Sequence, residues 1–234
     1  MKAILVVGGM GGIGSKIVEK LMPEYKIIVA DRTISDENRQ DQVDYINVDL
    51  TVDNEMVELA DKVSGYELYG VIFAAGIMLP GNVLELNYDD YIKTMNVNLN
   101  SVYRLCQLLI PILLKNKQSH IVMLASHLGV VGSYNLSAYS MSKAALIELA
   151  KCLALDFGDK GLLVNCISPA FVDTPMLNSA INKFATSKKW MFATGGLPKQ
   201  RMNVNDITKV VHMLLEQESM NGCNIVLDGA YTAR

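Results

Sequence analysis

Tyr139 and Lys143 stand four residues apart at the start of a long apolar segment, and these two side chains could carry out acid–base chemistry. If the segment is a helix, both side chains lie on one face. An ammonium held about 4 Å from a phenol, at an effective dielectric near 20, favours the phenolate by roughly 4 kcal/mol, or about three pKa units. The pair therefore predicts a general base near neutrality. By itself, the same spacing also fits an exposed tyrosine and lysine on a helix surface.

Two further features make the chemical interpretation stronger. Ser126 lies thirteen residues before Tyr139, at the end of an apolar run that predicts a strand over 119–125. Near the amino terminus, a predicted strand over 3–7 leads into the glycine-rich segment 8–14 and then into a helical pattern. Strand, glycine turn and helix in this order allow backbone N–H groups and the helix N-terminus to approach a pyrophosphate. A flexible loop is the alternative.

The glycines fit two nucleotide-binding spacings, which are G-x-G-x-x-G at Gly9, Gly11 and Gly14 and G-x-x-x-G-x-G at Gly8, Gly12 and Gly14. A second strand, predicted over 26–30, ends at Asp31. A carboxylate about twenty residues past the glycines can accept hydrogen bonds from the adenosine ribose hydroxyls, so we expect NAD as the cofactor. Arg32 follows directly and could hold the 2′-phosphate of NADP, which we regard as the less favoured cofactor.

Length and composition favour one α/β domain spanning residues 1–234. The chain is half apolar with a formal net charge of −3, which argues against a disordered chain and against a nucleic-acid partner. Its apolar runs are interrupted before they reach membrane-spanning length. The four cysteines lack C-x-x-C spacing and are expected to be reduced, in a cytoplasmic protein without a metal site.

Strands alternate with helices along the whole chain. Besides those already named, strands are predicted over 45–48, 70–76, 162–167 and 224–227. The polar stretch 33–44 is too short for a full crossover helix. About seven strands in this alternation predict a single-domain, Rossmann-type, doubly wound parallel sheet with helices on both faces.

Taken together, these motifs resemble those of the classical short-chain dehydrogenase/reductase family over essentially the whole chain. The family pattern T-G-x-x-x-G-x-G matches 7–14, where Val7 replaces the usual threonine, and N-N-A-G matches 73–76, where both asparagines are absent. We expect these departures to affect the rigidity of the two loops more than the catalytic chemistry. The family's P-G motif becomes Pro169-Ala170, and its helix asparagine falls on Asn98.

The resemblance implies an oxidoreductase that transfers a hydride between NAD(H) and a secondary alcohol or ketone. Tyr139 would exchange a proton with the substrate oxygen and Ser126 would hold that oxygen. Lys143 would lower the tyrosine pKa and bind the nicotinamide ribose, while Asn98 would hold a water that passes the proton to solvent. The cofactor-binding residues that the resemblance implies are Gly8, Gly12, Ile13, Gly14, Asp31, Asp49, Leu50, Ala75, Gly76, Tyr139, Lys143, Val172 and Thr174.

The segment 176–199 is a candidate substrate lid, because it is rich in large apolar side chains and follows the sixth strand. An ordinary packed pair of helices is the alternative. With Leu128 and Phe171 opposite, a closed lid would build an apolar pocket and favour a medium-sized, largely apolar or cyclic alcohol or ketone. The family resemblance and the very apolar helix predicted from Asn96 to Leu114 suggest a homotetramer.

Two other functions remain open at this point. A catalytically silent, nucleotide-sensing protein on the same fold would typically lack the tyrosine or the lysine, and an NADP-dependent ketone reductase would rely on Arg32. A methyltransferase with a similar glycine turn would leave Ser126, Tyr139 and Lys143 without roles.

Overall fold

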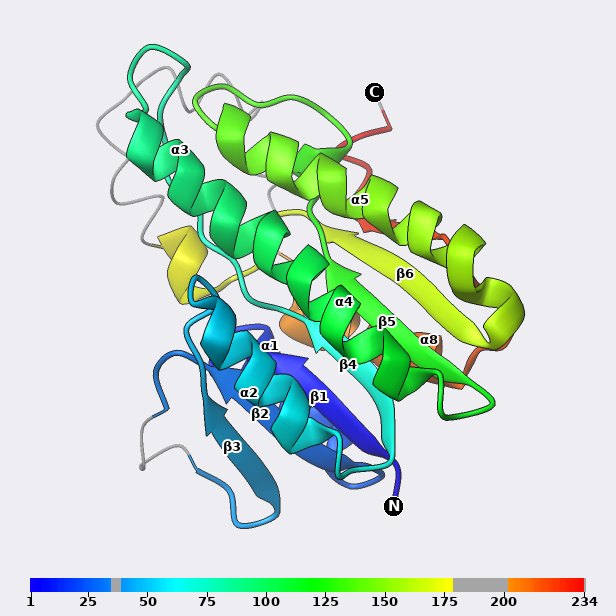
Figure 1. Cartoon of the computed structure of the whole chain (residues 1–234). Coiled ribbons are helices and arrows are strands. Elements are labelled where there is room, and N and C mark those ends of the chain that lie inside the picture. Colours follow the sequence, from blue (N-terminus) through cyan, green and yellow to red (C-terminus); the bar gives the residue numbers. More distant parts are fainter. Residues whose placement is uncertain (35–38, 179–201, 234) are drawn as a thin grey trace.

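A computed structural model describes residues 1–34, 39–178 and 202–233, and its strands form one seven-stranded parallel sheet (Figure 1). The strands are β1 Ala3–Val7, β2 Lys26–Asp31, β3 Val43–Asn47, β4 Leu68–Phe73, β5 Ser119–Leu124, β6 Leu162–Pro169 and β7 Asn224–Leu227. Their order is β3-β2-β1-β4-β5-β6-β7. The direction of winding therefore reverses between β1 and β4, and ligands of such sheets bind beyond the carboxyl ends of the strands at this point.

Helices cover both faces of the sheet. The helices are α1 Gly14–Leu21, α2 Asp53–Val63, α3 Tyr88–Met95, α4 Ser101–Leu113, α5 Ser137–Phe157 and α8 Val204–Glu216, with single turns η2 Asn96–Asn100, η3 His127–Gly129 and η4 Gly158–Lys160. In Figure 1, α2, α4 and α5 lie in front of the sheet, and α1 and α8 lie behind it. Among the described residues, no helix combines the length and apolarity needed to cross a membrane.

Two apolar layers hold these helices to the sheet. Leu59, Leu105 and Leu146 belong to the layer on the α2, α4 and α5 side. Ile17 and Val211 belong to the layer on the side of α1 and α8. Strands β1, β4 and β5 are buried at every residue, because apolar side chains on both faces of a parallel strand are covered by helices.

The rod formed by α3 and α4 contains one widened turn. In η2, the N–H of Ser101 donates to the carbonyl of Asn96, five residues back, as in a π-helix. Such single π-turns insert one residue into an α-helix and frequently occur at functional sites. Here the widened turn contains Asn98, which is completely buried.

The predicted doubly wound sheet is confirmed, and the tyrosine helix spans the predicted residues 137–157. None of the described residues between β2 and β3 is helical. Several strand ends differ from prediction. Strand β4 spans Leu68–Phe73 rather than 70–76, because the N–H groups of Ala74 and Ala75 both donate to the carbonyl of Val7 and the regular pairing stops there. Strands β3 and β5 each end one residue earlier than predicted, at Asn47 and Leu124. Strand β3 begins at Val43 rather than Tyr45, since it is an edge strand whose half-buried residues lack a continuous apolar run. Strand β6 continues to Pro169 because Cys166–Pro169 pair with β7.

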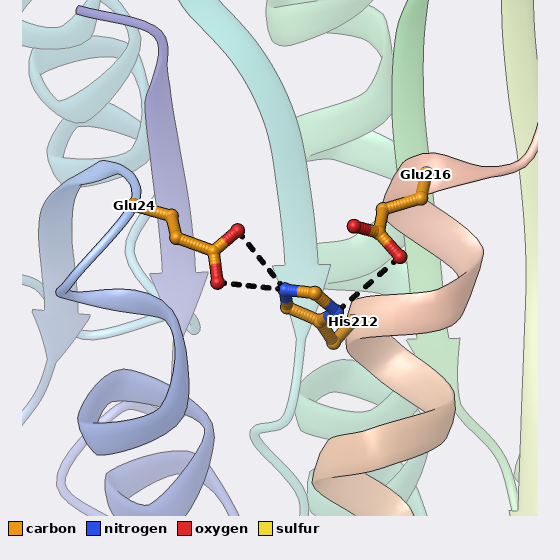
Figure 2. Close-up of side chains that lie close together, drawn as sticks. All are labelled: Glu24, His212 and Glu216. Carbon is orange, nitrogen blue, oxygen red and sulfur yellow. Dashed lines mark hydrogen bonds and ion pairs between the residues drawn. The ribbon is translucent and has the colours of Figure 1, made fainter.

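On the side of the sheet covered by α1 and α8, one histidine connects α8 to the turn after α1. His212 Nε2 lies 3.0 and 3.1 Å from the two carboxylate oxygens of Glu24, and its Nδ1 lies 3.5 Å from Glu216 Oε2. Figure 2 shows the two carboxylates facing opposite nitrogens of the ring. This arrangement suits N–H donation from both nitrogens, and it links two elements far apart in the sequence.

Candidate active site

One pocket opens at the carboxyl ends of the strands, where the loops after β4, β5 and β6 meet the first turns of α5. Ser126, Tyr139 and Lys143 line it together with Gly76 and Thr174. The structure therefore brings together residues that are up to about a hundred positions apart in the sequence.

The glycine segment is in close contact with the loop after β4 and with the residues after β6. Gly8 has a left-handed backbone with φ +84°, and a Cβ there would collide with the backbone of Ala75. A Cβ on Gly14 would collide with the carbonyl oxygen of Gly8. A Cβ on Gly12 would lie 3.0 Å from Pro175 Cδ and 3.2 Å from Thr174 Cβ. These glycines are needed where the backbone must pass very close to another segment.

Helix α1 begins at Gly14, the last of these glycines, with Ile13 at its N-cap. No side chain caps this end, and the first turn contains no acidic residue. The backbone N–H groups and the positive end of the helix dipole are therefore suited to an anion such as a pyrophosphate. The site fits the phosphate part of a dinucleotide.

Asp31 reaches the glycine segment from the end of β2. Its Oδ2 accepts a hydrogen bond from the N–H of Met10 at 3.0 Å, and its Oδ1 accepts one from Thr33 at 3.3 Å. The carboxylate is thus held beside the glycine turn, on the side where the adenosine half of a dinucleotide would lie. Arg32 is exposed.

Asp49 and Leu50 follow β3 and lie close to Asp31, because the N–H of Val48 donates to the carbonyl of Asp31 at 3.0 Å. The Asp49 carboxylate accepts hydrogen bonds from the hydroxyl and the N–H of Thr51, at 2.7 and 2.8 Å. These bonds lower the pKa of Asp49. The carboxyl group therefore stays ionised near neutrality.

The side-chain amide of Asn98 forms hydrogen bonds with neighbouring protein groups. Its Oδ1 accepts from the N–H of Ile77 at 2.8 Å, and its Nδ2 donates to the carbonyl of Ile77 at 2.9 Å and to Ser142 Oγ at 3.1 Å. Gly76 lies against it, since a Cβ there would be 3.4 Å from both Asn98 Oδ1 and Lys143 Nζ. Both amide protons of Asn98 already donate to protein groups. A water bound to this residue would therefore have to donate a hydrogen bond to its side-chain or backbone carbonyl oxygen.

Ser126 follows β5 and begins the turn η3, where its Oγ accepts from the N–H of Leu128 at 3.2 Å. This turn packs tightly on α5, because a Cβ on Gly129 would lie only 2.8 Å from the backbone of Lys143. The close packing places Ser126 near the phenol of Tyr139 in the wall of the pocket. Lys143 Nζ lies 5.8 Å from the centre of the Tyr139 ring and donates to the carbonyl of Leu124 at 2.7 Å.

Burial determines the electrostatics of this pair. It raises the pKa of Tyr139, and the neighbouring Ser126 hydroxyl acts in the opposite direction. It also lowers the pKa of Lys143 to about 8. The expectation that Lys143 brings the phenol close to neutrality is therefore wrong for this structure. Burial disfavours the phenolate, and the ammonium is directed to Leu124.

The substrate side of the pocket is mainly apolar. Met78, Leu128, Leu136, Phe171 and Leu177 line it. Val172 also lines it, and its carbonyl accepts from the hydroxyl of Thr174 at 3.4 Å. Of the predicted lid 176–199, the structure describes the first three residues, and the remainder lies outside the described residues.

Among the polar residues of the site that were not predicted from the sequence, two directly follow or precede a predicted residue in the chain. Ser142 is completely buried and donates to the carbonyl of Tyr139 at 2.7 Å. His127 lines the pocket beside Ser126. Their positions next to Lys143 and Ser126 were the only available signals, and such adjacency does not show where a side chain points.

Comparisons with known proteins agree with this geometry. The family model for short chain dehydrogenases matches residues 2–184. The 3-oxoacyl-[acyl-carrier-protein] reductase FabG of Buchnera aphidicola is 27% identical over 230 residues, covering 93% of this chain and 91% of that protein. The dehydrogenase/reductase SDR family member 6 of Aquarana catesbeiana is 32% identical, covering 77% of this chain and 75% of that protein. The crystal structure of a short chain dehydrogenase family protein from Francisella tularensis superposes with a TM-score of 0.90 at 27% identity, covering 100% of both chains.

Proposed function

Because the chain belongs to the short-chain dehydrogenase family, we propose that it is an oxidoreductase that transfers a hydride between NAD(H) and a secondary alcohol or ketone. The observation that carries this proposal is the convergence of Ser126, Tyr139 and Lys143 on one pocket beside the glycine turn. A protein that only senses nucleotide would not need a half-buried tyrosine and a buried lysine in this arrangement.

Tyr139 is the proposed proton donor. Burial raises its pKa, so the phenol keeps its proton at neutral pH and can donate it to a carbonyl oxygen. Ser126, which lines the pocket beside the phenol, would bind the same oxygen. Reduction of a ketone is therefore the direction that the protonation state of Tyr139 favours near neutrality.

The remaining residues would hold the cofactor, which supplies or accepts the hydride when it is bound. The glycine turn and the N-terminus of α1 would bind the pyrophosphate. Lys143 Nζ lies beside Gly76 and would hydrogen-bond the nicotinamide ribose. Thr174, which faces Gly12, would bind at the nicotinamide end.

We propose NAD rather than NADP as the preferred cofactor. The Asp31 carboxylate is held at the glycine turn by the N–H of Met10, where a 2′-phosphate would meet like charge and would lose the ribose hydrogen bonds. An NADP-dependent ketone reductase is the alternative, because exposed Arg32 could swing toward such a phosphate.

The substrate that fits best is a medium-sized, largely apolar or cyclic ketone. Apolar side chains line most of the pocket, with His127, Ser133 and Thr174 as polar exceptions outside the reacting residues. The similarity to a 3-oxoacyl reductase at 27% identity supports ketone reduction without deciding the substrate. A lid over 176–199 remains part of this proposal.

We further propose a cytoplasmic homotetramer. Tyr103 of α4 is 54% exposed, and Met141 and Leu155 of α5 are 53% and 85% exposed, so both helices offer apolar surface to a second copy. The cysteines are free thiols, as expected in a reducing compartment. Sedimentation as a monomer at all concentrations would contradict the assembly.

A substrate screen tests the proposed activity. The purified chain is mixed with NADH or NADPH and a panel of linear ketones, cyclic ketones, a 3-oxoacyl thioester and a ketose, and absorbance of the reduced cofactor is followed. We expect oxidation of NADH with apolar ketones. Tight binding of NADH without turnover of any ketone or alcohol would instead favour the nucleotide-sensing protein.

A further inference from the structure

His127 is a buried titratable residue that the proposed reaction does not use, although it is adjacent to Ser126 in the pocket wall. Only 2% of its surface is exposed. Its Nδ1 lies 3.1 Å from the carbonyl oxygen of Pro169 and 3.4 Å from Ser126 Oγ. Its Nε2 is buried and has no hydrogen-bond partner among the described residues.

These contacts determine which ring nitrogen carries the proton. A carbonyl oxygen can only accept, so Nδ1 must be the N–H donor toward Pro169. A proton on Nε2 would be a buried donor without an acceptor, which is costly. His127 is therefore neutral with its proton on Nδ1, and burial, which lowers its pKa, acts in the same direction.

The tautomer of His127 in turn determines how Ser126 uses its hydroxyl. A serine hydroxyl has two lone pairs and one proton. The N–H of Leu128 approaches Ser126 Oγ at 3.2 Å, and His127 Nδ1–H approaches it at 3.4 Å. Both neighbours are donors, so the Ser126 proton is left free to point into the pocket, which Tyr139 also lines.

We propose that His127 is a positioning residue that keeps Ser126 as a hydrogen-bond donor toward the reaction centre. This inference rests on the proposed function, in which Ser126 binds the substrate oxygen as negative charge develops on it. A donor hydrogen bond there stabilises the transition state, whereas an accepting hydroxyl would not.

The ring of His127 is held in place from two sides. Phe171 and Tyr231 contact it edge to face, with ring centres 5.0 and 4.9 Å away. Tyr231 belongs to a turn built around Asp228, whose carboxylate accepts from the N–H of Ala230 and from the N–H of Thr232 at 2.9 and 2.7 Å. The C-terminal segment thus supports the orientation of His127.

Three variants separate positioning from packing. His127→Asn can place an N–H near the position of Nδ1, His127→Gln reaches toward the position of Nε2, and His127→Phe keeps an aromatic ring without a donor. Thermal unfolding of each variant reports on folding. The titration of Tyr139 is followed by NMR of ¹³C-labelled tyrosine, with its resonance identified by its loss in Tyr139→Phe.

We expect His127→Phe and His127→Gln to raise the pKa of Tyr139, as Ser126→Ala does, and His127→Asn to restore it toward the wild-type value. With a ketone from the screen, kcat should fall about tenfold in His127→Phe, while the Kd for NADH should stay unchanged. In the Ser126→Ala background, His127→Phe should cause no further loss, because the group through which it acts is gone.

An unchanged Tyr139 titration in folded His127→Phe would overturn the proposal, and so would an equal loss of kcat in the Ser126→Ala background. If His127→Phe and His127→Gln prevent folding, the test rests on His127→Asn. In that variant, Tyr139 must titrate as it does in the wild type. The titration needs no substrate, so it distinguishes a failure of this proposal from a failure of the proposed activity.

Discussion

The side-chain amide of Asn98 donates to the hydroxyl of Ser142 over 3.1 Å, and Ser142 donates in turn to the carbonyl of Tyr139 over 2.7 Å. Asn98 also bonds both backbone groups of Ile77. One buried chain of hydrogen bonds therefore joins the loop after β4, the π-turn and the first turn of α5. Three segments of the active site are positioned relative to one another through two side chains.

Ser142→Ala should destabilise the protein, because it leaves one amide proton of Asn98 buried and unpaired. We expect a loss of about 1–3 kcal/mol in the free energy of unfolding, measured by urea titration. Ser140→Ala is the matched control in the same helix, since Ser140 Oγ is buried without a partner among the described residues. Equal effects of the two substitutions would show that the Asn98–Ser142 bond contributes nothing.

Tyr139→Phe should bind NADH as the wild type does and should lower kcat by about 10²–10⁴-fold, because it removes the proton donor and keeps the ring. Binding is measured by NADH fluorescence and kcat with the best ketone of the screen. Since burial raises the pKa of Tyr139, wild-type alcohol oxidation, which needs the phenolate, should increase as the pH rises above neutrality. A variant that retains more than about a tenth of kcat would contradict the role of Tyr139.

Asp31→Asn should shift the preference from NADH toward NADPH. The amide oxygen can still accept from the N–H of Met10, so the glycine turn is preserved while the charge is removed. We expect the ratio of kcat/KM for NADH over NADPH to fall about tenfold or more, because a hydrogen bond to a charged group is lost and a repulsion is relieved. A wild-type enzyme that prefers NADPH would disprove the assignment of Asp31.

Lys143→Met should stabilise the fold at neutral pH while weakening NADH binding. The pKa of Lys143 falls from 10.5 to about 8 on folding, so between these values the unfolded chain binds more protons than the native protein. The contribution of Lys143 to the free energy of unfolding therefore rises with pH across that window, by about 3 kcal/mol. Below the window, the full cost of burying the charged lysine destabilises the native protein.

The measurement compares urea unfolding of wild type and Lys143→Met at neutral pH and near the upper end of that window. We expect the difference between the two proteins to shrink as the pH rises, because other titrating groups are common to both. If the wild type is more stable than Lys143→Met at neutral pH, the prediction is wrong, and other groups of the fold offset the cost of burying the Lys143 ammonium.

Much of the architecture follows from local features of the sequence. Short apolar runs followed by glycines predict buried parallel strands, and the alternation with amphipathic segments predicts the doubly wound sheet, because burial on both faces requires apolar residues throughout each strand. The positions of Ser126, Tyr139 and Lys143 could be identified in the same way, since strand end and helical spacing are local properties. The start of β3 was misplaced because an edge strand lacks a continuous apolar run.

The tertiary structure alone decided the electrostatics and the polar connections of the site. The pKa values of Tyr139 and Lys143 depend on how completely the surrounding elements remove water, and the spacing of the pair contains no such information. The partners of Asn98 lie on two other segments, at Ile77 and Ser142. The protonated nitrogen of His127 is determined by the carbonyl of Pro169, which is 42 residues away in the chain. Hydrogen-bond direction depends on which groups meet in space, and the chain order does not reveal this.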